Sequence, residues 1–308
     1  MNLELNKIYQ GNTFEILKQM PEESVDCIIT SPPYYGLRDY GVSGQIGLEA
    51  TLEIYLNKIL AITKELKRVL KKTGTLWWNH GDSYGGGNGT NNNGSHGKVK
   101  QKMGVNNNNK RELLSDIPEK CLLLQNYRLI IRMIDEQQWI LRNSIIWWKQ
   151  NCMPASANDR FTNDYEPVFF LSKSTRYYFQ QQLEDSIWAR HDKRFIKGPT
   201  SGGKTTTGNY AIDKAGAYRK DGKRNMRSVW AINTKPYKDA HFATFPEELC
   251  EIPIKAGSPP NGIVLDPFSG SGTTAFVARQ LGRQFIGIEI NPDYIKLAEK
   301  RLAQQIML

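Results

Sequence analysis

Near its C-terminal end the chain carries a strand, a glycine-containing turn, a helix and a second strand that ends in an acid. The first strand is expected over Gly262 to Asp266, the helix over Thr273 to Leu281 and the second strand over Gln284 to Glu289. Glycines let the backbone approach a ligand closely, and an acid about 20 residues further on binds ribose hydroxyls in such units. The pattern therefore predicts an α/β fold with a nucleoside site at the strand ends.

The residues of this turn favour a nucleoside without a pyrophosphate. The turn from Pro267 to Gly272 lacks a full Gly-x-Gly-x-x-Gly pattern and the lysine of a phosphate-binding loop. Asp266 would also repel a pyrophosphate. S-adenosylmethionine fits better, and a nicotinamide-dependent enzyme is an alternative. A structural role also stays open, in which Asp266 caps the turn and Glu289 caps the helix expected over Asn291 to Leu302.

A second rigid feature, Ser31-Pro32-Pro33-Tyr34, follows the apolar strand predicted over Val25 to Thr30. The prolines fix their φ angles and lack N–H groups, so the segment presents its carbonyls without competing donors. Ser31 and the Pro32 carbonyl can accept hydrogen bonds from an exocyclic amine, while Tyr34 can stack on the ring. Beside an S-adenosylmethionine site, this pocket predicts methyl transfer to the amine of a base flipped out of a duplex. A merely structural Pro-Pro turn is the alternative.

The other predicted elements alternate between helices and strands. Hydrophobic periodicity indicates helices over Thr13 to Met20, Thr51 to Lys72 and Ile117 to Glu136. Apolar and aromatic runs indicate strands over Lys7 to Gln10, Thr75 to Asn79, Trp139 to Trp148, Glu166 to Leu171 and Tyr177 to Phe179.

Two polar segments interrupt these elements. Residues 83–110 are rich in Gly, Asn and Ser and predict a flexible loop, and residues 180–240 are basic and Gly-rich, as expected of an insertion. We therefore divide the chain into a catalytic half over 1–179, an insertion over 180–240 and a cofactor-binding half of the same domain over 241–308.

The net charge of +10 is concentrated in this insertion, where residues 190–227 carry eleven Lys and Arg against three Asp. Such a patch predicts a polyanionic partner, double-stranded DNA, although a basic surface kept for solubility would look the same. The expected DNA-binding residues are Lys98, Lys100 and Lys102 in the loop and Arg219, Lys220, Lys223, Arg224 and Arg227 in the insertion.

The four cysteines show no metal-ligand spacing, so no metal is expected, and none follows a proline as the nucleophile of cytosine carbon-5 methylation would. No apolar run approaches the roughly 20 residues that span a bilayer. We expect a cytoplasmic protein without a membrane partner.

The motifs and their order resemble the β-class amino-methyltransferases of DNA, the N4-cytosine and N6-adenine enzymes of restriction-modification systems and phages. In that family the catalytic motif precedes the target-recognition region and the cofactor motif follows it, as Ser31 to Tyr34 and Asp266 to Gly272 do here. The resemblance implies a Rossmann-like S-adenosylmethionine-dependent methyltransferase fold with circularly permuted motifs, a mostly parallel twisted sheet and an inserted target-recognition region. It also implies a bacterial, archaeal or phage origin and a cognate restriction endonuclease as a further partner, with monomer and homodimer both open.

Residue roles follow from the same resemblance. The implied catalytic residues are Ser31, Pro32, Pro33 and Tyr34, with Asn163 to Val168 near the base pocket. The implied cofactor-binding residues are Asn12, Thr30, Phe242, Asp266, Pro267, Phe268, Ser269, Gly270, Gly272, Thr273 and Glu289. The family commonly has Asp where this chain has Asn12, although Asn can still accept through its carbonyl.

Ser at the first position of the catalytic motif resembles the N4-cytosine enzymes, whereas adenine enzymes more often carry Asp or Asn there. We therefore expect N4-cytosine as the target, with N6-adenine as the alternative within the same fold. A DNA-binding protein with a decayed cofactor site is the alternative from another class.

Overall fold

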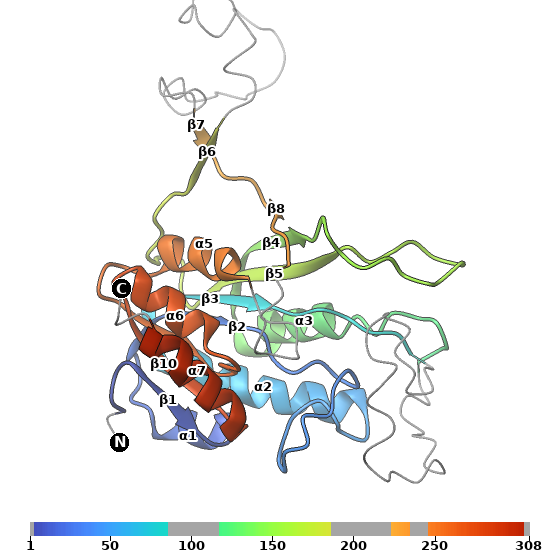
Figure 1. The fold of residues 1–308 in the computed structure, drawn as a ribbon, viewed down its shortest axis with the longest axis horizontal. Coiled ribbons are helices and arrows are strands. Elements are labelled where there is room, and N and C mark those ends of the chain that lie inside the picture. The colour runs from blue at the N-terminus through green and yellow to red at the C-terminus, as the bar shows by residue number, and fades with distance from the viewer. Residues whose placement is uncertain (1–2, 86–116, 186–222, 235–245, 305–308) are drawn as a thin grey trace, which may run out of the picture. The chain divides into compact units, whose positions relative to one another are not determined.

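The computed structural model describes residues 3–85, 117–185, 223–234 and 246–304 (Figure 1). The chain forms two units, the first made of residues 1–179 with 229–308 and the second of residues 180–228. In the portion that the structure describes, no helix is both long enough and apolar enough to cross a membrane. The predicted DNA-binding Lys98, Lys100, Lys102, Arg219 and Lys220 and the predicted cofactor contact Phe242 lie outside the described residues.

An eight-stranded sheet forms the centre of the first unit, in the order β1-β10-β9-β2-β3-β5-β4-β8. Its strands are β1 (Lys7–Gln10), β2 (Val25–Thr30), β3 (Leu70–Asn79), β4 (Ile140–Trp148), β5 (Tyr165–Ser172), β8 (Val229–Ala231), β9 (Ile263–Asp266) and β10 (Gln284–Glu289). Neighbouring strands pair in parallel except around β5, which is antiparallel to both β3 and β4. The predicted α/β fold with a mostly parallel sheet is confirmed.

Strands β2 and β9 lie side by side at the point where the chain direction across the sheet reverses. From β2 the chain continues to β3 on one side, and from β9 it continues to β10 on the other. In open α/β sheets, ligands bind outside the carboxyl ends of strands at such a switch point. Both sequence motifs begin at these two strand ends.

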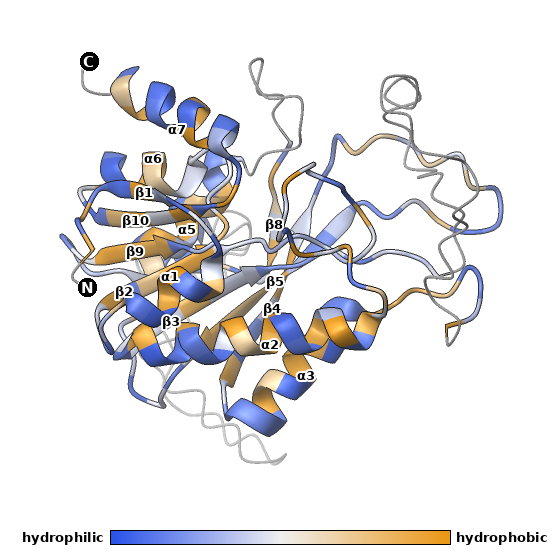
Figure 2. Ribbon diagram, turned by 90° about the horizontal axis from the view of Figure 1, so that it is seen from below, coloured by the Kyte–Doolittle hydropathy of each residue, from blue (hydrophilic) through white to orange (hydrophobic). Residues whose placement is uncertain are grey.

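Helices cover both faces of the sheet (Figure 2). Helices α1 (Thr13–Gln19), α2 (Leu52–Val69) and α3 (Gln125–Gln137) pack in succession as one layer, and α5 (Glu247–Gly257), α6 (Thr273–Gln280) and α7 (Pro292–Gln304) as another. The strands of a sheet covered on both faces are apolar nearly throughout. The buried runs of β2 and β9 follow this rule.

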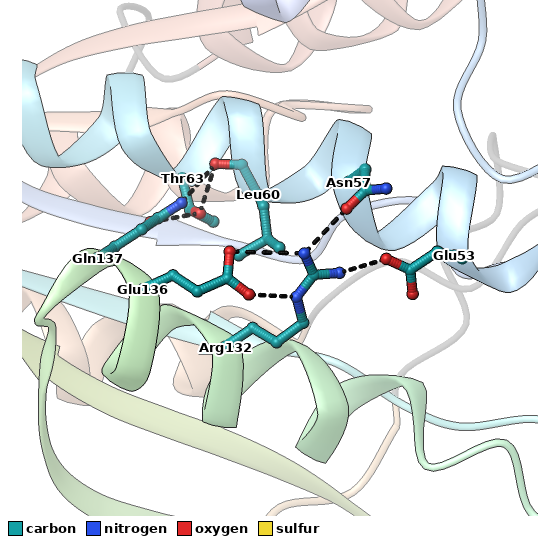
Figure 3. A network of polar contacts seen from close by, with 7 residues as sticks. All are labelled: Glu53, Asn57, Leu60, Thr63, Arg132, Glu136 and Gln137. Carbon is teal, nitrogen blue, oxygen red and sulfur yellow. Dashed lines mark hydrogen bonds and ion pairs between the residues drawn. The ribbon is translucent and has the colours of Figure 1, made fainter.

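Polar contacts connect the exposed sides of α2 and α3 (Figure 3). Arg132 of α3 binds Glu53 and Asn57 of α2 together with Glu136 of its own helix. Exposed ion pairs of this kind stabilise by less than about 1 kcal/mol each. Most of the stability of this layer therefore comes from the buried apolar faces of the helices.

The predicted elements differ from the structure in four places. The third helix begins at Gln125 and not at Ile117, because Leu124 before it lies in the left-handed region with a φ of 51°. The second helix ends at Val69 and not at Lys72, because Leu70 already pairs with Val25 in the sheet. Residues 177–179, which the structure describes, form no strand, although the Tyr178 N–H donates to the Thr73 carbonyl at 2.8 Å. Helix α5 was not predicted, since Pro253 inside it suggests a break.

The predicted insertion over 180–240 also extends further than the second unit. Strand β8 pairs with β4 and belongs to the large sheet. The described part of the second unit is a small antiparallel pair of β6 (Leu183–Asp185) and β7 (Lys223–Asn225), in which Glu184 binds both Arg224 and Arg227.

Candidate active site

The carboxyl ends of β2 and β9 are joined by a direct hydrogen bond between two buried side chains. The hydroxyl of Thr30 donates to Asp266 Oδ1 at 2.7 Å. Thr274 donates to the other carboxylate oxygen at 2.7 Å, and the N–H of Phe268 donates to Oδ1 at 3.1 Å. Two residues far apart in the sequence, both predicted for the site, thus meet at the switch point.

Burial raises the pKa of Asp266 to about 6, although the hydrogen bonds from Thr274, Thr30 and the Phe268 N–H oppose the shift. Burial away from water disfavours the charged carboxylate, and hydrogen bonds from these three donors offset part of that cost. Asp266 is therefore a connection between the two motifs as well as a predicted ligand contact.

The glycine turn after β9 fits close approach by a ligand. Gly270 and Gly272 both have positive φ angles, +51° and +77°, which L-residues other than glycine rarely adopt. A Cβ on Gly272 would also lie 2.7 Å from the Cβ of Ala298. In the same turn, the buried Ser269 hydroxyl has no partner among the described residues. A buried polar group without a partner is costly, so a bound polar ligand would complete this turn.

Glu289 ends β10 beside this turn and is largely buried. Its two oxygens accept backbone N–H groups of Gly270 and Asn291, each at 2.8 Å. Burial raises its pKa, against the effect of these two hydrogen bonds. A carboxylate has about four acceptor sites, so the Glu289 oxygens can accept further hydrogen bonds.

The other residues predicted for the cofactor have different partners. Asn12 caps α1, where its Oδ1 accepts from Phe14 and Glu15 N–H groups. Next to it, the Thr13 hydroxyl donates to the Pro267 carbonyl at 2.7 Å, a contact that the sequence did not reveal. Phe268 packs half-buried against the core. The Thr273 hydroxyl accepts a hydrogen bond from Arg301 of α7.

Tyr34 is the centre of a polar cluster at the end of β2. Its hydroxyl lies 3.0 Å from Glu166 Oε2, 3.0 Å from Ser31 Oγ and 3.3 Å from Asn79 Oδ1. Lys149 forms an ion pair with the same Glu166. Residues 163–168 were expected near the base pocket, but Lys149 and Asn79 carry no sequence signal of their own.

Charges in this cluster decide the direction of its hydrogen bonds. Burial would raise the pKa of Glu166, but Lys149 and the donors around it outweigh burial and hold the pKa below its ordinary value. Burial and the Glu166 charge raise the pKa of Tyr34 well above its ordinary value, so the phenol keeps its proton. That single proton goes to the carboxylate. Ser31 must then donate to the Tyr34 oxygen, and its own lone pairs stay available as acceptors.

A chain of hydrogen bonds from the sheet also holds the proline segment. The Tyr55 hydroxyl donates to the Pro33 carbonyl at 2.9 Å and lies 3.1 Å from His80 Nε2. The indole N–H of Trp78 points to His80 Nδ1 at 3.4 Å. Because Tyr55 gives its only proton to Pro33, His80 Nε2 must carry a proton. Nδ1 accepts from Trp78 and carries none, so the ring is neutral. Burial lowers the pKa of His80 to about 3, which agrees with this neutral form.

The ring of Tyr34 is fixed from one side. It lies 5.1 Å from the His80 ring, between centroids, at an angle of 35°. A Cβ on Gly81 would come within 2.7 Å of the Tyr34 ring, so only glycine leaves room there. None of the described residues form a group of three or more acidic, His or Cys side chains able to hold a metal ion.

Comparison with known proteins identifies the family of the chain. The N6_N4_Mtase family model, described as DNA methylase, matches residues 25–300. The Type II methyltransferase M.Cfr9I of Citrobacter freundii is 40% identical over 97% of this chain and 89% of its own length. The Type II methyltransferase M.SmaI of Serratia marcescens is 38% identical over 99% of this chain and 93% of its own length.

Solved structures share the fold. PvuII DNA methyltransferase (cytosine-N4-specific) has a TM-score of 0.61 and 22% identity over 96% of this chain and 85% of that chain. A putative DNA modification methylase of Thermus thermophilus, complexed with S-adenosyl-L-methionine, has a TM-score of 0.59 and 22% identity over 97% of this chain and 94% of that chain. The cofactor of such enzymes is S-adenosylmethionine, and the glycine turn, the unpartnered Ser269 hydroxyl and Glu289 fit it. The chain belongs to the N6/N4 family of DNA methylases, as a methyltransferase of the restriction-modification type.

Proposed function

We propose that this methyltransferase modifies the exocyclic N4 amine of a cytosine that has flipped out of duplex DNA. The observation that carries the proposal is the polarity of the Ser31–Tyr34–Glu166 cluster, which leaves the Ser31 oxygen as a hydrogen-bond acceptor beside the switch point. The serine at this position also resembles the N4-cytosine enzymes.

The amine needs help because its lone pair is delocalised into the ring. Hydrogen bonds accepted from its protons by Ser31 Oγ and the Pro32 carbonyl favour a pyramidal, more nucleophilic nitrogen. Tyr55 engages the neighbouring Pro33 carbonyl and thereby fixes the segment. Tyr34, held on one face by His80, offers its other face to the flipped base. S-adenosylmethionine supplies an electrophilic methyl group, so alignment of the amine is the main task of these residues.

The cofactor side is proposed to bind through the glycine turn and the strand ends. Glu289 accepts ribose hydroxyls, Ser269 donates to the ligand, and Asp266 holds Thr30 against the turn. Asn12 acts through α1, whose start it caps. The remaining contacts proposed from the resemblance are Phe242, Pro267, Phe268, Gly270, Gly272 and Thr273.

Recognition of the DNA sequence is proposed for the basic insertion, with the lysines of the Gly/Asn-rich loop as further phosphate contacts. The test is to neutralise Arg219, Lys220, Lys223 and Arg224. The slope of log affinity against log salt concentration should become shallower by about 0.9 for each phosphate that the protein no longer neutralises. A cytoplasmic location and a cognate restriction endonuclease also belong to this proposal.

The test of the target base is direct. Purified protein is incubated with plasmid DNA and S-adenosylmethionine that carries a labelled methyl group, and the DNA is digested to nucleosides. Label in N4-methylcytosine supports the proposal, and label in N6-methyladenine replaces it with the alternative. Sequencing of DNA from an expressing host then gives the recognition sequence.

A further inference from the structure

The loop between β4 and β5, residues 149–164, leaves the sheet at the same edge as the catalytic segment. Strand β4 runs in the direction of β3, because both are antiparallel to β5, so Trp148 ends at the edge where Thr30 ends. Lys149 and Glu166, at the two ends of the loop, form the ion pair that holds Tyr34. Figure 1 shows the loop extending beyond the ends of both strands.

Side-chain contacts attach this loop to the segments around the site. The Arg160 guanidinium lies 4.5 Å from the centre of the Tyr84 ring, and Asn163 donates to the Tyr84 hydroxyl at 3.3 Å. Lys120 forms an ion pair with Asp159 at 2.7 Å. Because Tyr84 follows closely on β3, the loop has a defined place relative to Tyr34.

One large apolar side chain on this loop is left in water. Phe161 is 95% exposed and is the most exposed of the large hydrophobic residues that the structure describes, ahead of Met153 on the same loop at 64%. Single exposed apolar residues are common and need no explanation alone. Here, however, the phenylalanine stands beside Arg160 on a loop that is anchored at the catalytic edge.

We propose that the β4–β5 loop contacts duplex DNA and that Phe161 enters the base stack next to the flipped base. Flipping leaves an unstacked gap, and proteins that distort DNA insert apolar side chains between bases. Arg160, next to Phe161 on the same loop, offers a positive charge to the phosphates. The inference deepens the proposed function and rests on it, since it needs a base that leaves the duplex.

The test compares Phe161→Ala, Phe161→Trp and the control Ile131→Ala, which removes an exposed apolar side chain from α3. Single-turnover methylation is measured on a duplex with the mapped recognition sequence and on the same duplex with an abasic position opposite the target. The second duplex is easier to open. Thermal melting and S-adenosylmethionine affinity are measured for every variant.

Stacking of a base on an aromatic ring is removed in Phe161→Ala, so transfer on the intact duplex should fall roughly 5- to 100-fold. The decrease should be smaller on the abasic duplex, while Phe161→Trp and Ile131→Ala should behave like the wild type. Equal rates for Phe161→Ala and wild type on the intact duplex would overturn the inference. So would an equal decrease on both duplexes, since Phe161 would then stabilise the loop and not the opened duplex. Absence of transfer by the wild type would instead refute the proposed function.

Discussion

On the cofactor side of the site, Asp266, the glycine turn and Glu289 come from one continuous strand-turn-helix-strand segment. On the base side, Tyr34 is held by side chains from separate segments: Asn79 and His80 at the end of β3, Lys149 after β4 and Glu166 in β5. The first arrangement is set mainly by local backbone geometry, the second by charges brought together through the sheet. The two sides meet where Thr30 binds Asp266.

Removal of the base-side groups should therefore separate the two sides most clearly. Tyr34→Ala and Ser31→Ala should each lower kcat by about 100-fold or more, because stacking or the amine acceptor is removed. Affinity for S-adenosylmethionine, measured by calorimetry, should stay within a factor of about two. A large decrease of cofactor affinity in either variant would show that the two sides are not separate.

Asp266 belongs to both sides of the site, so a change there should affect both the stability of the protein and its cofactor affinity. Asp266→Ala leaves the Thr30 and Thr274 hydroxyls buried without their acceptor, which should cost roughly 3 kcal/mol of unfolding free energy. Denaturant unfolding and cofactor titration measure the two effects. Unchanged stability would mean that the hydroxyls find other partners.

The pKa of Asp266 gives this position a pH signature. Folding raises the pKa from 3.8 to about 6, so the folded state binds a proton more tightly than the unfolded state. The resulting stabilisation, roughly 3 kcal/mol, is fully present below pH 4 and is lost as the pH rises through 6. Denaturant melts from pH 4 to 7 should show this slope in the wild type and not in Asp266→Asn. The same slope in both proteins would assign it to another group.

Glu166→Gln tests whether the charge of Glu166, and not only its shape, sets the direction of the hydrogen bonds at Tyr34. The amide can donate to the Tyr34 oxygen, so the phenol proton can turn to Ser31 and occupy the acceptor needed by the amine. Turnover should fall about 10- to 100-fold with no change in cofactor affinity. Glu166→Asp, which keeps the charge, should retain more activity than Glu166→Gln. The reverse order would contradict the assigned proton positions.

The smallest effect is expected for Tyr55→Phe, which removes only the donor to the Pro33 carbonyl. One hydrogen bond contributes about 1 kcal/mol, so kcat should fall about 5-fold through a less fixed proline segment. The KM for S-adenosylmethionine should not move. A rise of this KM by about the same factor would mean that the variant disturbs the cofactor side as well as the proline segment.

The cofactor half was largely predictable because its signals are local: an apolar strand, glycines at positive φ and an acid at the next strand end. The predicted ends of that segment differ from the structure by at most two residues. Helix α5 was not predicted because a proline such as Pro253 usually interrupts a helix. Residues 177–179 were predicted as a strand because they are rich in aromatic side chains, but Tyr177 and Phe179 pack on Phe170 and the segment forms no strand.

By itself, the sequence determined the α/β class, the cofactor turn and the identity of the Ser31 to Tyr34 segment, because each depends on a short run of residues. Only the tertiary structure decided which groups surround Tyr34 and how its proton is directed. Lys149, Asn79 and His80 acquire their roles from the order of strands in the sheet, which no short run of residues encodes. The physical reason is that hydrogen-bond direction depends on charges within a few ångström in space, whatever their separation along the chain.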